Sequence, residues 1–133
     1  EAARLAGDAD WYVVLSNDVV CTGRFVDKLG ALGDVVAGPY IRQNMGWQYV
    51  EGWCVCANRH VWNTVGGWDG RFIMSCWEDV NFSQAAVEQG FPLEWQPLPF
   101  KHLDQAQRFG LPGYAGSEQH NYDLFLSNRQ VRA

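Results

Sequence analysis

One segment constrains the fold more than any other: the apolar run WYVVL at residues 11–15, which ends abruptly in the polar residues 16–18. Consecutive aromatic and β-branched residues bounded by polar ones are typical of a short strand that is covered on both faces. Such strands occur in sheets that have helices on both sides. We therefore expect an α/β fold in which Asp18 lies just beyond the carboxyl end of this strand.

The rest of the chain alternates between strand-like and helix-like segments. We expect further strands at residues 35–40, 49–57 and 93–98, and helices at residues 22–32, 60–65 and 80–88. The first of these helices is expected to be capped by Thr22. Residues 42–48 are polar and contain Gly46, which predicts a loop. A loop there is too irregular for a helical crossover, so the sheet is expected to be mixed.

The two ends of the chain have different characters. Residues 1–6 look like the end of a helix that Gly7 closes, so the sequence is interpreted as a fragment. From Leu103 onward the chain is polar and rich in glycine, with helical character only near residues 122–126.

Composition excludes several classes of protein. The 133 residues are 47% apolar, which is enough for the core of one domain, and the net charge of −5 disfavours binding to nucleic acid. No apolar window is long enough to span a membrane. The 4 cysteines are too sparse for a disulfide scaffold and are expected to be reduced, which predicts a cytoplasmic protein.

Several segments, taken in order, resemble the family-two glycosyltransferases of the GT-A type. They are residues 11–20, Val50-Glu51-Gly52, residues 65–72, residues 78–82, and Gly90-Phe91 before Pro97 and His102. The resemblance implies a GT-A-like α/β fold, a mixed sheet flanked by helices, over residues 1–102. It covers about the second half of a catalytic domain and lacks the N-terminal half that binds the nucleotide. Residues 103–133 are then a polar C-terminal extension that packs on or near the site.

The first candidate site is a metal site at Asp18. Ser16-Asn17-Asp18 resembles the family's Asp-X-Asp signature with serine in place of the first acid. A carboxylate at a strand end suits Mg²⁺ or Mn²⁺, which prefer oxygen ligands and bridge to phosphates. The resemblance also implies that His102 reaches the metal or the diphosphate. The alternatives are that Asp18 begins a turn and that His102 is a structural hydrogen-bonding residue.

The second candidate site is the acidic pair Glu78-Asp79 at the start of a helix. The resemblance implies that Asp79 is the general base for the acceptor hydroxyl and that Glu78 orients the base or binds the acceptor. The helix N-terminus is expected to keep the carboxylate ionised. The alternative is that both acids only stabilise the helix start. The family's next acid is Asn81 here, so a role that needs charge at that position is lost.

Glycines and tryptophans form the candidate acceptor side. The resemblance places Gly66 and Gly67 in a loop that admits a sugar, although a helix C-cap turn would also use glycine. Aromatic rings near the motifs could stack on sugars, or could be core. The substrate-binding candidates are Gly52, Trp53, Gly66, Gly67, Trp68 and Trp77.

The resemblance implies an inverting, metal-dependent glycosyltransferase. Its partners would be a nucleotide-diphosphate sugar donor and a glycan, lipid or protein acceptor. The isolated chain is expected to be inactive, and an apolar face left by the absent half favours a homo-oligomer. One rival is a non-catalytic carbohydrate-binding or interaction module derived from the acceptor half. A second rival, a cysteine-based metal or redox protein, rests only on Cys54 and Cys56, which are more commonly buried free thiols.

Overall fold

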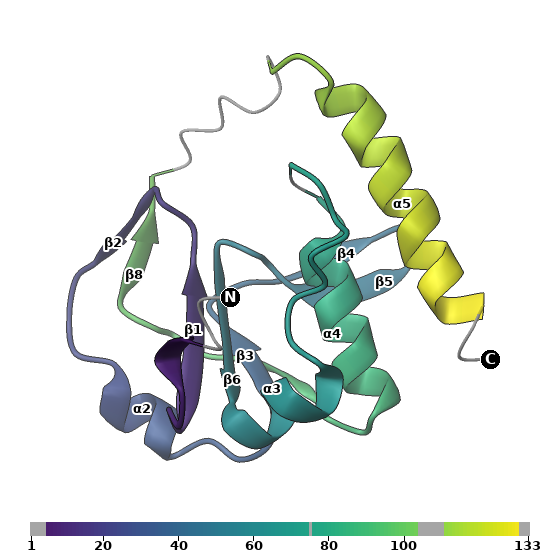
Figure 1. Ribbon diagram of the computed structural model, residues 1–133. Helices are drawn as coiled ribbons and strands as arrows, with labels where there is room; N and C mark the ends of the chain where they lie inside the picture. The colour runs from purple at the N-terminus through teal and green to yellow at the C-terminus, as the bar shows by residue number, and fades with distance from the viewer. Residues whose placement is uncertain (1–4, 75, 104–110, 131–133) are drawn as a thin grey trace.

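The computed structural model describes residues 5–74, 76–103 and 111–130. Its centre is a four-stranded sheet with the order β1-β6-β3-β7 (Figure 1). The strands are β1 (Trp11–Leu15), β6 (Cys54–Asn58), β3 (Val36–Gly38) and β7 (Leu93–Trp95). Strand β6 is antiparallel to β1 and β3, whereas β3 and β7 are parallel. The sheet is therefore mixed, as the sequence predicts.

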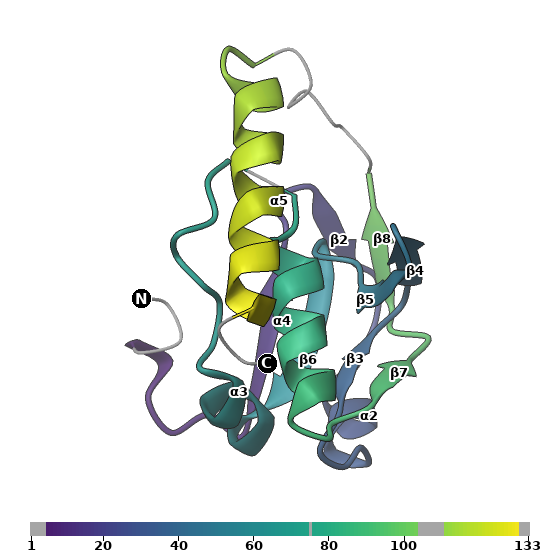
Figure 2. The same ribbon diagram turned by 90° about the vertical axis from the view of Figure 1, so that its right-hand side faces the viewer.

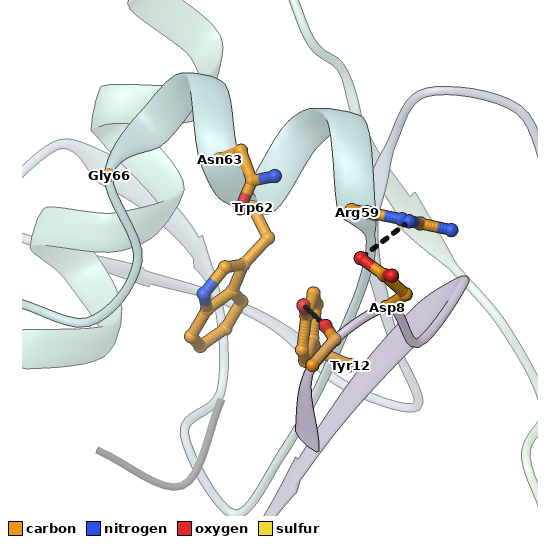
Figure 3. Close-up of a pocket in the computed structure, with 7 residues that line it drawn as sticks. Asp8, Tyr12, Arg59, Trp62, Asn63 and Gly66 are labelled. Atoms are coloured by element: carbon orange, nitrogen blue, oxygen red, sulfur yellow. Dashed lines mark hydrogen bonds and ion pairs between the residues drawn. The ribbon is translucent and has the colours of Figure 1, made fainter. Parts of the chain in front are cut away.

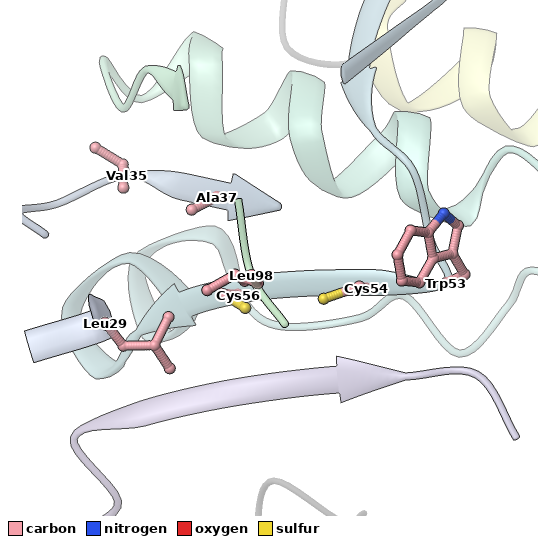
Figure 4. Packing of buried hydrophobic residues seen from close by; sticks show 7 residues of the cluster. All are labelled: Leu29, Val35, Ala37, Trp53, Cys54, Cys56 and Leu98. Carbon is pink, nitrogen blue, oxygen red and sulfur yellow. The ribbon is translucent and has the colours of Figure 1, made fainter. Parts of the chain in front are cut away.

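Helices cover both faces of this sheet. They are α2 (Val26–Gly30) on one face, and α3 (Arg59–Val65) and α4 (Glu78–Glu88) on the other. Successive strand residues point to opposite faces, so Cys56 packs in one cluster with Leu29 of α2 (Figure 4). Val55 packs in the other cluster with Val61 of α3 and Phe82 of α4. The predicted α/β class is confirmed at this level.

Two ribbons and one helix complete the described chain. The ribbons are β2 (Val19–Cys21) with β8 (Phe100–His102), and β4 (Ile41–Asn44) with β5 (Trp47–Val50). Helix α5 (Tyr114–Gln130) lies beside α4 (Figure 2). None of the helices in the described part of the chain combines the length and apolar character that crossing a membrane requires.

The ribbon β4-β5 corrects the expected loop at residues 42–48. Asn44 pairs with Trp47, so Met45 and Gly46 alone make the turn, with φ of +48° and +86°. Two central residues with positive φ are the mark of the tight turns that suit a hairpin. Strand β4 is mostly exposed and therefore lacks an apolar pattern in the sequence.

The expected strand at residues 49–57 is also divided, because β5 ends at Val50 and β6 begins at Cys54. The intervening turn contains Gly52 and Trp53, two of the candidate site residues.

Helix α2 is shorter than predicted and is not capped by Thr22. Its N-cap position is Phe25, and Leu32 lies beyond its end. The hydroxyl of Thr22 donates instead to the carbonyl of Pro99 at 3.0 Å, which ties the end of β2 to the chain before β8. A hydroxyl already used across the ribbon cannot cap the helix.

Strand β1 differs from the fully covered strand that its composition predicts. It lies at an edge of the sheet in the described residues, and its first four residues are half-buried. Leu15 is 41% exposed. An apolar run of this length therefore does not distinguish an inner strand from an edge strand.

Helix α5 is much longer than the helical segment expected at residues 122–126. Its buried positions are Tyr114, Ser117, Asn121 and Phe125. Two of these four are polar, so the helix buries a face that carries no regular apolar pattern. The helices predicted at 60–65 and 80–88 are confirmed as α3 and α4.

Candidate functional site

Asp18 lies where the chain leaves β1 and enters the ribbon β2-β8. Val19 pairs with His102 in this ribbon, and the amide of Leu103 donates to the carbonyl of Asp18 at 2.9 Å. The pairing brings the two side chains together, with His102 Nε2 3.1 Å from Asp18 Oδ2. The hydroxyl of Ser16 donates to the other carboxylate oxygen. Ser16 therefore holds the carboxylate of Asp18.

Asp18 and His102 are the two side chains of this site that could hold a divalent cation. Both are partly accessible, with side-chain exposures of 20% and 26%. Metal–ligand bonds of about 2.1 Å separate two adjacent ligands of an octahedron by roughly 3 Å, which suits the 3.1 Å between these atoms.

The described residues contain no group of three or more acidic, histidine or cysteine side chains that could enclose a metal. Mg²⁺ and related ions are usually held by one or two protein ligands, with water and substrate phosphates at the other positions. The pair therefore fits an open site of that kind and not an all-protein cage.

Trp53 supports His102 from one side. The two rings are stacked, with centroids 5.0 Å apart and planes at 4°. The indole nitrogen donates to Glu51 at 3.1 Å, and Glu51 also pairs with Arg42 at 3.2 Å. Trp53 is only 7% exposed, so it orients the imidazole and offers little surface to a sugar.

Asp79 is held by backbone amides. Its Oδ2 accepts from the amide of Gly52 at 2.8 Å, and its Oδ1 accepts from the amide of Val80 at 2.8 Å. The pKa of Asp79 is nevertheless raised, because burial outweighs these donors and Glu51 adds a like charge. Burial therefore opposes the expected effect of the helix start, which favours the ionised carboxylate.

Gly52 makes this contact possible. A Cβ at Gly52 would lie 3.0 Å from Asp79 Oδ2 and 3.1 Å from the Cβ of Asp79. The glycine therefore allows Asp79 to approach the backbone closely. This structural role differs from the sugar-binding role that the resemblance implies for Gly52.

Three residues connect the two carboxylates: His102 contacts Asp18, Trp53 stacks on His102, and the neighbouring Gly52 holds Asp79. We call Asp18, His102, Trp53, Gly52 and Asp79 the strand-end cluster. Glu78 precedes Asp79 in the first turn of α4 and is partly buried. The cluster combines an accessible carboxylate–imidazole pair with a buried carboxylate that has an increased affinity for protons.

Two residues of this region were missed in the sequence. Glu51 connects Trp53 to Arg42, and Tyr49 lies close enough for its pKa to rise to about 12 through burial and the charges of Asp79 and Glu51. Glu51 belongs to the segment Val50-Glu51-Gly52, and Tyr49 lies three residues before Gly52, but neither is named as a site residue from the sequence.

The structure does not bring Gly66 and Gly67 into the strand-end cluster. Both have positive φ and both amides donate to the carbonyl of Trp62, which is the helix C-cap alternative. A Cβ at Gly67 would meet Trp62 Nε1 at 3.0 Å. Trp68, which follows them, stacks on Phe82 at 5.5 Å.

Gly66 instead lines a separate pocket of about 530 Å³ between α3 and the amino end of β1 (Figure 3). Its charged and hydroxyl groups already pair with one another: Arg59 with Asp8, and Tyr12 with the carbonyl of Gly7. Asp18 follows the opposite, carboxyl end of β1, so this pocket does not belong to the cluster.

Trp77 and the two central cysteines are core residues. Trp77 is 5% exposed and packs against Tyr122 and Phe125 of α5. Cys54 and Cys56 are fully buried free thiols (Figure 4). A hydrogen bond with Cys56 and burial raise the pKa of Cys54, which favours the protonated thiol.

Comparison of the chain with protein-family models, with curated proteins and with solved structures found no significant match.

Proposed function

We propose that this chain forms the metal and acceptor side of an inverting glycosyltransferase with a GT-A-like fold. The observation that carries the proposal is the strand-end cluster, which connects a carboxylate suited to a divalent ion with one suited to proton transfer. The mixed sheet with helices on both faces also agrees with such a fold. The donor would be a nucleotide-diphosphate sugar, and the acceptor a glycan, lipid or protein hydroxyl.

Asp79 is the general base in this proposal. It takes the proton of the acceptor hydroxyl as the oxygen attacks the anomeric carbon, and the bond from that carbon to the diphosphate breaks on the opposite face. A raised carboxylate pKa strengthens the base, provided that it is ionised at the working pH. The amides of Gly52 and Val80 fix both oxygens, and Glu78 orients the acceptor beside them.

Asp18 and His102 would hold Mn²⁺ or Mg²⁺ on the diphosphate. The ion supplies stabilisation of the negative charge that develops on the leaving group. Ser16 and Trp53 keep the two side chains oriented by a hydrogen bond and by ring stacking.

The test is titration of the ¹⁵N-labelled chain with Mn²⁺ in the presence of uridine or guanosine diphosphate. Paramagnetic Mn²⁺ broadens nearby amide signals even when binding is as weak as about millimolar, the limit we expect for this chain. We expect selective broadening of residues 16–20 and 100–103, and its loss in Asp18→Ala. Asp27→Ala, at an exposed acid in α2, is the matched control and should behave as wild type.

Broadening that survives in Asp18→Ala, or that appears equally at other exposed acids, removes Asp18 from the site. Oligosaccharide binding with no response to Mn²⁺ would instead favour the non-catalytic carbohydrate-binding module.

A further inference from the structure

Asn121 of α5 is a buried polar residue whose bonds lead toward Asp79. It is fully buried, and its Oδ1 accepts from the amide of Ile73 at 3.0 Å. Its Nδ2 donates to the carbonyls of Ile73 at 2.8 Å and of Cys76 at 3.0 Å. Burying an amide is costly unless its hydrogen bonds are made. Asn121 is therefore used to hold the backbone just before α4.

The backbone just before α4 adopts unfavourable conformations that contacts with other parts of the chain must stabilise. Met74, Cys76 and Trp77 have φ of +58°, +80° and +70°. Left-handed conformations cost non-glycine residues about 1 kcal/mol or more each and persist only when the surroundings fix them. Helix α5 provides part of this support, because Trp77 packs against Tyr122 at 4.7 Å and Phe125 at 5.1 Å.

Helix α5 also holds the chain on the other side of Asp79. Asn81 Oδ1 accepts from Arg129 at 2.6 Å and from Asn128 at 3.0 Å, and Arg129 also donates to the Asn81 carbonyl at 3.1 Å. The amide of Asn81 donates to the carbonyl of Trp77 at 2.8 Å. Asp79 thus lies between two parts of the chain that α5 holds: Ile73, Cys76 and Trp77 before it, and Asn81 after it.

We propose that α5 is the support that positions Asp79, with Asn121 as its main positioning residue and the Arg129–Asn81 contact as the second. The significance of this inference for catalysis rests on the proposed function, but the positioning itself does not. The test therefore measures geometry and not transfer, so that failure of one proposal is distinguishable from failure of the other.

The reporter is hydrogen–deuterium exchange of the Gly52 amide, which donates to Asp79 Oδ2. The reference is the amide of Val55 in β6, a central strand of the sheet, so the ratio of the two exchange rates separates local displacement of Asp79 from global unfolding. In Asn121→Ala we expect this ratio to rise about tenfold or more, since removal of one buried partner leaves backbone groups unsatisfied.

The matched control is Ser117→Ala. Ser117 is 2% exposed in the same helix, but among the described residues its hydroxyl bonds within α5, to the carbonyl of Tyr114 at 2.7 Å. We expect this variant to lower stability while the ratio stays at the wild-type value. A similar rise in Ser117→Ala and Asn121→Ala would show that any damage to α5 has this effect and would overturn the specific role of Asn121.

A second variant covers the case in which Asn121→Ala does not fold. Arg129→Met keeps a long apolar side chain at this position but removes the guanidinium, with its donors to Asn81, its contact over the Phe125 ring and its ion pair with Glu88. In Arg129→Met we expect a smaller rise of the same exchange ratio. If Asn121→Ala does not fold, a wild-type ratio in Arg129→Met overturns the proposal. An unchanged ratio in a folded Asn121→Ala overturns it directly.

Discussion

Asp18 lies in the turn before a two-stranded ribbon and its carboxylate is held by side chains, whereas Asp79 lies at the start of an 11-residue helix and is held by backbone amides. Among the described residues, Asp18 is contacted by a hydroxyl and an imidazole, which both belong to side chains and can be replaced as partners. The partners of Asp79 belong to the backbone of Gly52 and Val80 and cannot.

This difference suits two different tasks. A carboxylate with replaceable partners can exchange them for an ion and its water. A carboxylate fixed by backbone donors keeps one position and can meet a substrate atom repeatedly in the same geometry. The predictions below test the two sides of the comparison, beginning with Asp79.

The largest effect is expected from Asp79→Asn. The amide keeps the shape of the side chain but has no useful proton affinity, so turnover should fall by about 10²- to 10⁴-fold. Affinity for the nucleotide sugar should be unchanged, because Asp18 and His102 are untouched. The measurement compares turnover and donor affinity in the same variant of the active enzyme.

Glu78→Gln is the matched control, because it removes the neighbouring acid of the same helix turn. Near-native turnover of Asp79→Asn together with a large loss in Glu78→Gln would assign the base to Glu78.

The next effect concerns the support of Asp79 and is expected from Gly52→Ala. The added Cβ would meet the Asp79 carboxyl at 3.0 Å, and such overpacking costs about 1–3 kcal/mol. Urea denaturation should show this loss in the free energy of unfolding. Gly30→Ala is the control, since a Cβ there meets nothing within 4 Å and α2 should gain up to about 1 kcal/mol. Equal stability of the two variants would mean that a Cβ at residue 52 does not clash with Asp79.

The predictability of each region follows from how it buries its side chains. Strand β3, helix α4 and the position of Asp18 could be predicted, because short apolar runs and an apolar helix face leave a pattern in the sequence. Helix α5 could be predicted only near residues 122–126 and not over its full length, because Ser117 and Asn121 occupy its buried face. The hydrogen bonds that stabilise the buried Asn121 are made with residues 45 and 48 positions earlier in the chain. A local sequence pattern cannot indicate such distant partners.

The same reasoning applies within the strand-end cluster. The motifs identified Asp18, Asp79 and His102 as chemically capable residues, but not what connects them. The stacking of Trp53 on His102 and the bond from Gly52 to Asp79 depend on how distant segments meet. Sequence reasoning accordingly predicted a sugar-binding role for Gly52 and Trp53, whereas the structure shows each of them supporting a neighbouring side chain.

A smaller effect is expected on the Asp18 side from His102→Phe. Phenylalanine keeps an aromatic ring against Trp53 but removes the nitrogen that lies 3.1 Å from Asp18. Loss of a ligand or of its orienting partner typically lowers metal affinity about tenfold or more. The Mn²⁺ concentration for half-maximal broadening of residues 16–20 should rise accordingly. His60→Phe, at a histidine in α3, should leave it unchanged.

The smallest effect is on the pH dependence of stability, and it distinguishes Asp79 from an ordinary paired carboxylate. Burial raises the pKa of Asp79 above the ordinary 3.8. Between pH 3.8 and the raised pKa, the folded chain therefore binds more protons than the unfolded chain. The contribution of Asp79 to the free energy of unfolding is therefore fully present below pH 3.8 and is lost as the pH rises through the raised value.

Asp69 provides the opposite sign. Its hydrogen bonds with Arg71 lower its pKa to about 2, so its contribution is present above pH 3.8 and is lost as the pH falls toward 2. Urea denaturation from pH 2 to 7 should show that Asp79→Asn flattens the decline of stability above pH 3.8, whereas Asp69→Asn flattens the rise below it. If Asp79→Asn instead flattened the rise of stability below pH 3.8, as Asp69→Asn does, the carboxylate would be stabilised in its charged form. The backbone amides would then outweigh burial, and the proposed difference in proton affinity between Asp79 and an ordinary surface carboxylate would not hold.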